Sequence, residues 1–246
     1  MEPFEIDEAR AAGMAERLAA VEGPVTDDVA AARQAGEALR RIIDRLTATS
    51  APPEVLREVV SRLAPVEELL EPYGQVVRGY VGTAEASGLG PDRAFFDWSP
   101  LLGLANPLAP PMRVWVDGRS IAGRARFGIA YEGPPGCVHG GIIAAAFDEL
   151  LGLTQSLSGQ AGMTGTLTVK YRRPTPLHRV LRLEGTVDSV NGRKVLVSGR
   201  MYCGETLTAE AAGLFVSMKA ETFRALADQR QPRPGSTVDE DSAPPD

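Results

Sequence analysis

A short interval in the middle of the chain carries residue types that suit hydrolysis of an activated carbonyl compound. His139-Gly140-Gly141 opens an apolar run with helical character, and Asp148 lies nine residues after the histidine. Two glycines at a helix start let another group approach backbone N–H donors at the positive end of the helix dipole. We expect Asp148 to be buried, because its neighbours are apolar, and a buried carboxylate is costly unless chemistry needs it. The pattern predicts a site that holds an oxyanion and activates a water.

The same residues favour a thioester over an amide as the bond that is broken. A carboxylate beside a water raises the nucleophilicity of that water, and one N–H donor at a developing oxyanion contributes about 3–4 kcal/mol. A thiolate leaves with little acid assistance, whereas an amine needs a general acid. A site without a catalytic histidine therefore suits a thioester.

The composition is that of an ordinary enzyme rather than of a nucleic-acid-binding or disulfide-rich protein. The chain has 246 residues, 43% hydrophobic and 24% charged residues, and a net charge of -6, which argues against a nucleic-acid partner. Two cysteines and two histidines are too few for a disulfide framework or a Cys/His metal cluster, so we expect no metal, no cofactor, reduced thiols and a cytoplasmic location. The acidic start has no signal-peptide pattern, and no apolar stretch is long enough for stable membrane insertion, so neither is expected.

Three regions follow each other along the chain. Residues 1–95 predict a helical N-terminal extension of two or three amphipathic helices, in which Pro65 should kink or restart the third. The apolar face that carries Leu39, Ile42, Ile43 and Leu46 is expected to pack on the rest of the protein or on another subunit. Residues 224–246 are rich in proline and poor in apolar groups, which predicts a disordered tail.

Residues 96–223 predict an α+β domain. Strands are expected at 112–117 and 120–131, followed by one long buried helix at 138–157 and strands at 164–173, 180–190, 193–203 and 206–218. Asp117-Gly118 and Asn191-Gly192 predict tight hairpin turns. The last strands follow each other without helical crossovers, which favours an antiparallel sheet.

The order and spacing of four short motifs resemble those of the hot-dog-fold acyl-CoA thioesterases, most closely the PaaI-like group. The resemblance covers about residues 113–218, and its motifs are Gly133 to Gly141, Asp148, Met163-Thr164 and Tyr171-Arg172-Arg173-Pro174. It implies an antiparallel sheet wrapped around a long central helix and hydrolysis of an acyl-CoA to a carboxylic acid and CoA, without a cofactor.

The resemblance also implies roles for individual residues. Asp148 becomes the general base or nucleophile, and the Gly140 backbone amide polarises the thioester carbonyl. His139 contacts substrate or braces the turn, and Gly141 lies against the substrate. Thr164 positions the water or the carboxylate, with Thr166 as a second candidate expected on the same strand face. Some relatives hold the water with an asparagine just before the histidine, where this chain has Gly133-Pro134-Pro135-Gly136.

Basic residues near one hairpin are candidates for the phosphates of CoA. Arg193 and Lys194 follow the Asn191-Gly192 turn and resemble a basic pair that some family members place near those phosphates. Lys170, Arg172 and Arg173 would help if they occupy the right strand face. The alternative for Arg193 and Lys194 is a solvated hairpin tip.

The spacing of the two principal site residues predicts a dimer. Gly140 and Asp148 are eight residues apart, or ~12 Å along a helix, so one carbonyl carbon cannot touch both groups of one chain. Antiparallel central helices across a two-fold axis would bring Asp148 of one subunit to Gly140 of the other. We therefore expect a homodimer, or a dimer of dimers, with composite sites.

Three alternatives stay open at this stage. Glu149 competes with Asp148 as the base. The domain is a non-catalytic acyl-CoA or lipid-binding module if no carboxylate with a hydroxyl partner faces the site, and dehydration of a hydroxyacyl thioester is a third option. The acyl group is expected to be fatty, because alanine, leucine and isoleucine side chains of the central helix would line an apolar slot.

Overall fold

The computed structural model describes residues 6–73, 93–160, 162–219 and 221. Its first helices are α1 (Glu8–Ala20), α2 (Asp27–Ala48), α3 (Pro53–Leu70) and the short α5 (Arg93–Trp98). They are followed by β1 (Arg113–Asp117), β2 (Ser120–Ala125), the 3-10 turn η1 (Ile129–Tyr131), α6 (Gly140–Ser156), β3 (Gly162–Tyr171), β4 (Leu181–Asn191), β5 (Lys194–Cys203) and β6 (Thr206–Ser217). The predicted tail at 224–246 lies outside the described residues.

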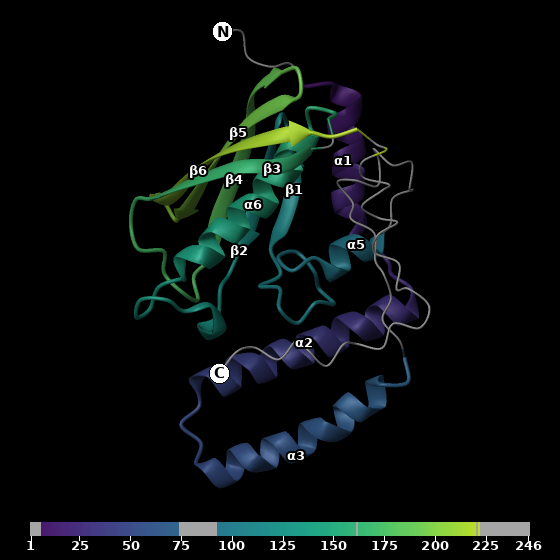
Figure 1. Ribbon diagram of the computed structural model, residues 1–246, viewed down its shortest axis with the longest axis vertical. Helices are drawn as coiled ribbons and strands as arrows, with labels where there is room; N and C mark the ends of the chain where they lie inside the picture. Colours follow the sequence, from purple (N-terminus) through teal and green to yellow (C-terminus); the bar gives the residue numbers. More distant parts are fainter. Residues whose placement is uncertain (1–5, 74–92, 161, 220, 222–246) are drawn as a thin grey trace.

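The strands form one six-stranded antiparallel sheet in the order β1-β2-β4-β5-β6-β3. The sheet curves around α6, which runs along its inner face (Figure 1). Both predicted hairpin turns are confirmed, with Gly118 at φ 59° and Gly192 at φ 56°, where a side chain would be strained. The expected α+β hot-dog architecture, with helices at the N-terminus, is therefore confirmed.

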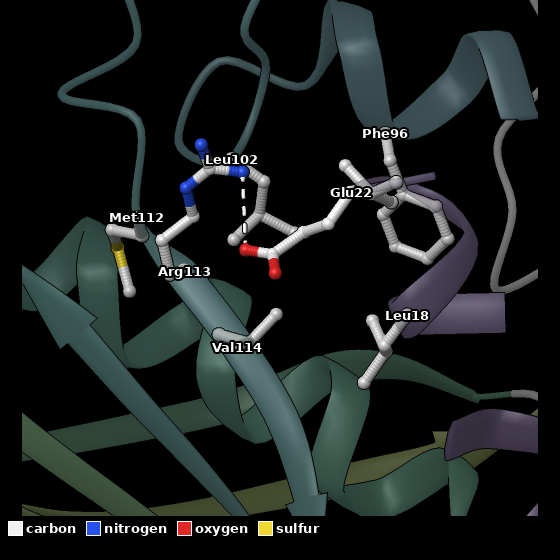
Figure 2. Close-up of a pocket in the computed structure, with 8 residues that line it drawn as sticks. Leu18, Glu22, Phe96, Leu102, Met112, Arg113 and Val114 are labelled. Carbon is white, nitrogen blue, oxygen red and sulfur yellow. Dashed lines mark ion pairs between the residues drawn. The ribbon is translucent and has the colours of Figure 1, made fainter. Parts of the chain in front are cut away.

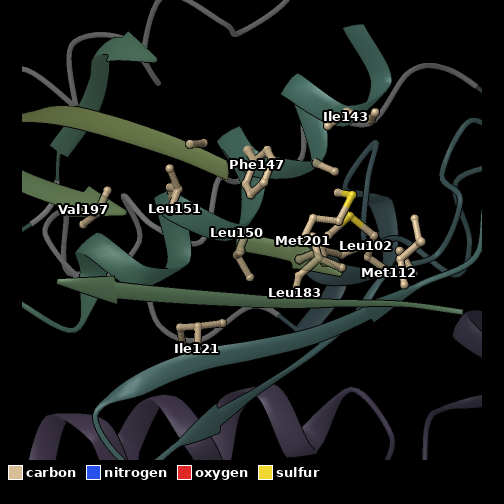
Figure 3. Close-up of a cluster of buried hydrophobic side chains, with 14 of the residues drawn as sticks. Leu102, Met112, Ile121, Ile143, Phe147, Leu150, Leu151, Leu183, Val197 and Met201 are labelled. Carbon is tan, nitrogen blue, oxygen red and sulfur yellow. The ribbon is translucent and has the colours of Figure 1, made fainter. Parts of the chain in front are cut away.

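α6 lies close to the sheet because the strands beneath it present glycine. Gly185 of β4 pairs with Gly199 of β5, and a Cβ on Gly185 would lie 2.3 Å from Oγ1 of Thr154 on α6. Large side chains surround this contact and form the core between helix and sheet (Figure 3). The fully buried members on α6 are Ala146, Phe147, Leu150, Leu151 and Thr154. Each large apolar side chain among them contributes about 1.5–3 kcal/mol by leaving water.

The second predicted strand is shorter than expected. The sequence suggested extended structure to Tyr131, but β2 ends at Ala125 and the chain turns through η1. Two long-range bonds explain the change: the Phe127 carbonyl accepts from the His178 N–H, and the Tyr131 carbonyl accepts from the His139 N–H. These bonds satisfy backbone groups that a longer strand would have paired with β4.

The N-terminal helices differ from one another in how they pack. Met14 and Leu18 of α1 are buried in the core beside β1, as an amphipathic helix predicts. α3 is one continuous helix through Pro65, so the chain does not restart there, and none of its residues is buried. None of the helices in the described part of the chain has both the length and the apolarity needed to cross a bilayer.

The apolar face of α2 is partly exposed and does not bury itself on the rest of the described protein, so packing on another subunit stays a prediction. Ile42, Ile43 and Leu46 are 37%, 36% and 48% exposed. α2 instead docks on η1 and α5 through a different stripe, which carries arginine, glycine and aspartate. Directional bonds from long polar side chains, rather than apolar burial, hold this helix to the domain.

Candidate active site

The first turn of α6 leaves one backbone donor open. An α-helix begins with four N–H groups that lack intrahelical partners. Here the Gly141 N–H donates to His139 Nδ1 at 3.0 Å, and the Ile142 and Ile143 N–H groups donate to the His139 carbonyl at 3.0 and 3.2 Å. Within the described residues, the Gly140 N–H has no acceptor. It is therefore a backbone donor that remains open to a ligand at the start of α6.

The side chain of His139 is used as a helix cap. Because Nδ1 accepts a hydrogen bond, the neutral ring carries its proton on Nε2. Of the two predicted roles for His139, the geometry thus favours bracing the turn. The Gly141 N–H, expected to face substrate, is committed to this cap.

The segment before His139 is a closed turn. The Gly133 N–H donates to the Cys137 carbonyl, and Glu132 pairs with Val138 in a single bridge. A Cβ on Gly133 would lie only 2.7 Å from His139 Cα, so glycine is required for this close approach. The stretch from Gly133 to Gly136 contains no polar side chain. It does not replace the water-holding asparagine expected in some relatives.

Asp148 is exposed at the edge of the protomer, which corrects the expectation that it is buried. The reason is that β3 is the outermost strand and leaves one side of α6 uncovered. Oγ1 of Thr164 on β3 donates to Asp148 Oδ1 at 2.8 Å, so Thr164 occupies the predicted position beside the carboxylate. That bond orients one carboxylate oxygen and leaves the other able to accept from a water.

The neighbouring acid, Glu149, is less exposed than Asp148, and its carboxyl group is enclosed by its surroundings. Ser99 Oγ donates to Glu149 Oε1 at 3.0 Å, on the side of α6 that faces the α5–β1 connector. Burial raises the pKa of Glu149 to about 7; the Ser99 hydrogen bond opposes the rise and the nearby Asp148 charge adds to it. Since Glu149 lacks the open position beside β3, the geometry favours Asp148 over Glu149 as the base.

A bulge in β3 reverses the expected face of Thr166. Thr164 pairs with Phe215, but Thr166 pairs with the next residue, Leu214, because Gly165 is the extra residue of the bulge. Phe215 is buried against α6, and Leu214 belongs to the outer face. The prediction that Thr164 and Thr166 share a face is therefore wrong, since it assumed unbroken alternation.

The same register places Lys170 on the outer face. Lys170 pairs with Glu210, and its Nζ lies 4.0 Å from a carboxylate oxygen of that residue. Arg172 also forms an ion pair with Glu210. These basic groups belong to a charged ladder on the far side of the sheet from Asp148, so the predicted contribution of Lys170 to the site is not supported by its position.

Tyr171 is a site residue to which sequence reasoning assigned no role. It ends β3 on the inner face, and its hydroxyl donates to the Gly140 carbonyl at 2.9 Å. Its ring is 54% exposed and lies at van der Waals distance from where a Gly140 side chain would begin. β3 thus contacts α6 at both predicted catalytic positions, with Thr164 at Asp148 and Tyr171 at Gly140.

Arg193 and Lys194 lie at the same end of the sheet as Thr164. Val195, Phe215 and Thr164 form one row across β5, β6 and β3, so the β4–β5 turn is ~10 Å from Thr164 at two strand spacings. Arg193 Nε donates to the Ser217 carbonyl, and Lys194 is exposed. Within the described residues, no group of three His, Cys, Asp or Glu side chains is placed to hold a metal.

A small cavity elsewhere in the protein does not belong to this site. It lies between α1, α5 and β1, and an ion pair between Arg113 and Glu22 at 3.4 Å spans it (Figure 2). Its volume of about 20 Å³ has room for roughly one water. The large apolar side chains of α6, expected to line an acyl slot, instead fill the core.

Comparisons with known proteins agree with this geometry. Residues 135–210 match the family model of the thioesterase superfamily. The chain is 38% identical to acyl-coenzyme A thioesterase THEM4 of Bos taurus over 92 residues, or 37% of this chain and 38% of that protein. It is 38% identical to the THEM4 protein of Xenopus laevis over 89 residues, or 35% and 40% of the two chains. The match thus spans about two-fifths of the length of these relatives.

A solved structure extends the likeness beyond the matched domain. The crystal structure of a thioesterase superfamily protein is 33% identical in sequence, with a TM-score of 0.67, and the alignment covers 76% of this chain and 90% of that one. The shared region is therefore larger than the sheet and α6 alone. The open Gly140 donor, the Thr164–Asp148 pair and this coverage agree, and the chain belongs to the thioesterase superfamily.

Proposed function

We propose that this protein is an acyl-CoA thioesterase that hydrolyses an acyl-CoA to a carboxylic acid and CoA. The observation that carries the proposal is the pair of groups on α6: an unpaired Gly140 N–H at its start and the Thr164-bound Asp148 carboxylate near its middle. The similarity to proteins named acyl-coenzyme A thioesterase supports CoA esters as the substrate class.

In the proposed reaction, Asp148 activates the attacking water and the Gly140 N–H stabilises the charge that develops on the carbonyl oxygen. The free oxygen of Asp148 accepts a proton from a water as that water attacks the thioester carbon. The Gly140 N–H, at the positive end of the helix dipole, stabilises the oxyanion that forms. Collapse of the tetrahedral intermediate breaks the C–S bond, and the CoA thiolate leaves and takes up a proton.

The proposal requires a homodimer with two composite sites. Gly140 and Asp148 are ~12 Å apart along one helix, which is too far for one carbonyl group. β3 is a ten-residue edge strand whose outer backbone groups a second copy would pair. The uncovered side of α6 carries small residues, Gly141, Ala144 and Ala145, which permit close approach of a partner helix.

The finer assignments rest on position and composition. Arg193 and Lys194 are proposed to meet the CoA phosphates, since Arg and Lys bind phosphate well and both lie near the Thr164 end of the sheet. The acyl group is proposed to be fatty and to lie between subunits, because the large apolar side chains of α6 are buried in the core of one chain. Together with a fatty acyl substrate, we propose a cytoplasmic location and a role in fatty acid metabolism.

A non-catalytic acyl-CoA-binding module is the second candidate. A pure binder has no need of a carboxylate held by a hydroxyl group opposite an oxyanion donor. The Thr164–Asp148 hydrogen bond therefore favours the enzyme.

The test is CoA release from short, medium and long acyl-CoA esters by wild type and Asp148→Asn, with molar mass measured in parallel. We expect kcat to fall on the order of a hundredfold or more in a variant that remains dimeric. Acyl-CoA binding without turnover of any ester by wild type would support the binding module instead. A wild-type monomer with full activity would overturn the composite site.

A further inference from the structure

α2 docks on the domain through a polar stripe that reaches two loops of the active site. Arg33, Gly36, Arg40 and Asp44 recur at spacings of three and four residues, so they share one side of the helix. Gly36 is the buried residue of α2, and a Cβ there would lie 2.6 Å from the Ala105 carbonyl oxygen. The helix backbone is thus seated directly on the connector between α5 and β1.

The first segment held by α2 is the end of α5 and the start of this connector, residues 97–106. Arg33 forms a bidentate ion pair with the buried Asp97, at 2.6 and 3.0 Å. Arg40 donates to the carbonyls of Leu104 and Asn106 at 2.8 and 2.7 Å. Gly103 folds the loop back on itself by donating to the Ser99 carbonyl. Four charge-assisted bonds therefore set the position of a short, closed loop.

Ser99 connects that loop to the catalytic helix. Its Oγ accepts from the N–H groups of Leu101 and Leu102 and donates its one proton to Glu149. Three hydrogen bonds therefore fix the orientation of the Ser99 hydroxyl group. Glu149 is adjacent to Asp148, so this bond limits rotation of α6 about its axis at the position of the catalytic acid.

The second loop held by α2 is η1, which precedes the oxyanion turn. The carboxylate of Asp44 lies against Gly128, the N-cap residue of η1, and accepts from the Ala130 N–H at 3.5 Å. At the end of η1, the Tyr131 carbonyl accepts from the His139 N–H at 2.9 Å. This last bond fixes the residue that caps α6 and precedes the Gly140 donor.

We propose that α2 is a positioning element of the active site, which fixes the orientation of α6, and with it the positions of Asp148 and Gly140, through the Ser99–Glu149 and Tyr131–His139 contacts. The expected effect on kcat rests on the proposed thioesterase reaction. The expected effect on the order of the connector and of α6 does not. It assigns the N-terminal extension a role in catalysis. Hydrogen bonds to arginine have a defined direction, so they fix the register of a loop more strictly than apolar contact does.

The experiment compares two neighbouring arginines of α2 in the full-length protein. Arg40→Met removes both bonds to the connector, whereas Arg41→Met removes an arginine whose side chain pairs with the exposed Glu37 on the same helix. We expect Arg40→Met to lower kcat roughly ten- to a hundredfold with little change in KM, because small misplacements of catalytic groups act on kcat. Arg41→Met should keep the wild-type values.

Hydrogen exchange provides a second readout that does not depend on turnover. In Arg40→Met, backbone amides of residues 97–106 and 139–149 should exchange faster, while those of β4 and β5 remain as in wild type. If wild type hydrolyses no ester, the thioesterase proposal fails, and this exchange pattern still decides the positioning role.

Unchanged kcat and unchanged exchange in a folded Arg40→Met protein would overturn the proposal. If Arg40→Met does not fold, Arg40→Lys keeps a charge and fewer bonds and is judged by the same two measurements. A double variant with Ser99→Ala should lower kcat by less than the product of the two single effects, because both act on α6 through one path. Full multiplicativity would count against that path.

Discussion

The buried carboxyl of Glu149 makes stability depend on pH in a direction that can be calculated. Burial raises its pKa from 4.5 to about 7, with a smaller opposing effect from the Ser99 hydrogen bond. A pKa difference of one unit corresponds to 1.36 kcal/mol, so the shift amounts to roughly 3 kcal/mol. This is a large fraction of the stability of an ordinary domain.

The sign follows from proton binding in the two states. Between pH 4.5 and about 7, the folded protein keeps the proton on Glu149 whereas the unfolded chain has released it. The unfolding free energy therefore falls as pH rises through this window and becomes level above it. Glu149→Gln removes the titration while it keeps an oxygen that can accept from Ser99.

Urea denaturation of wild type and Glu149→Gln, at one fixed protein concentration, measures this difference. Because all other groups titrate in both proteins, subtracting the two curves isolates Glu149. We expect the variant to gain about 3 kcal/mol relative to wild type between pH 4.5 and pH 8. Ser99→Ala should move the wild-type window to higher pH, because the hydrogen bond that lowers the pKa of Glu149 is lost.

Parallel curves for wild type and Glu149→Gln would refute the reasoning. They would mean that the carboxyl is solvated in solution and that the Ser99 contact does not enclose it. The positioning role of the connector would then lose its link to α6. A gain at low pH instead of high pH would equally contradict the assigned direction.

Two further variants test the turn that carries the oxyanion donor. Tyr171→Phe removes the hydroxyl bonded to the Gly140 carbonyl and should lower kcat about three- to tenfold, the equivalent of one net hydrogen bond, in steady-state kinetics. Tyr202→Phe on the outer face is its control, and equal kcat in both would contradict a role for Tyr171. Gly133→Ala should lower the unfolding free energy by about 1–3 kcal/mol in urea, because its Cβ meets the His139 backbone. A Cβ at Gly136 would contact no atom, but this residue has φ 73°. Gly136→Ala should therefore lower the unfolding free energy only by the backbone strain of that conformation, about 1–2 kcal/mol.

Most of the domain could be predicted from local patterns. The strands after α6 and both glycine-containing hairpin turns follow from alternation and turn chemistry, and the helix follows from its apolar run. The bulge at Gly165 was missed because strict alternation was assumed, although an isolated glycine inside a strand pattern is a known signal for a bulge. Its consequence was large, because it moved Thr166 and Lys170 to the outer face.

The two adjacent acids show a second limit of local reasoning. Asp148 and Glu149 have the same apolar neighbours in the sequence, from which burial was expected for Asp148. Which one is buried depends on what covers each side of α6: the connector with Ser99 covers one side, and the edge strand β3 leaves the other open. Only the tertiary packing around α6 distinguishes the environments of Asp148 and Glu149.

The residues that do the proposed chemistry lie within ten positions of each other, but the residues that place them do not. Ser99, Tyr131, Thr164 and Tyr171 come from four separate segments, and each contacts α6 or its cap within a residue of a catalytic group. A motif can therefore identify the acid and the donor and still say nothing about how α6 is oriented in the site. Because transition-state stabilisation depends on the placement of both groups, variation in the supporting segments, including α2, should change turnover while the motif itself stays intact.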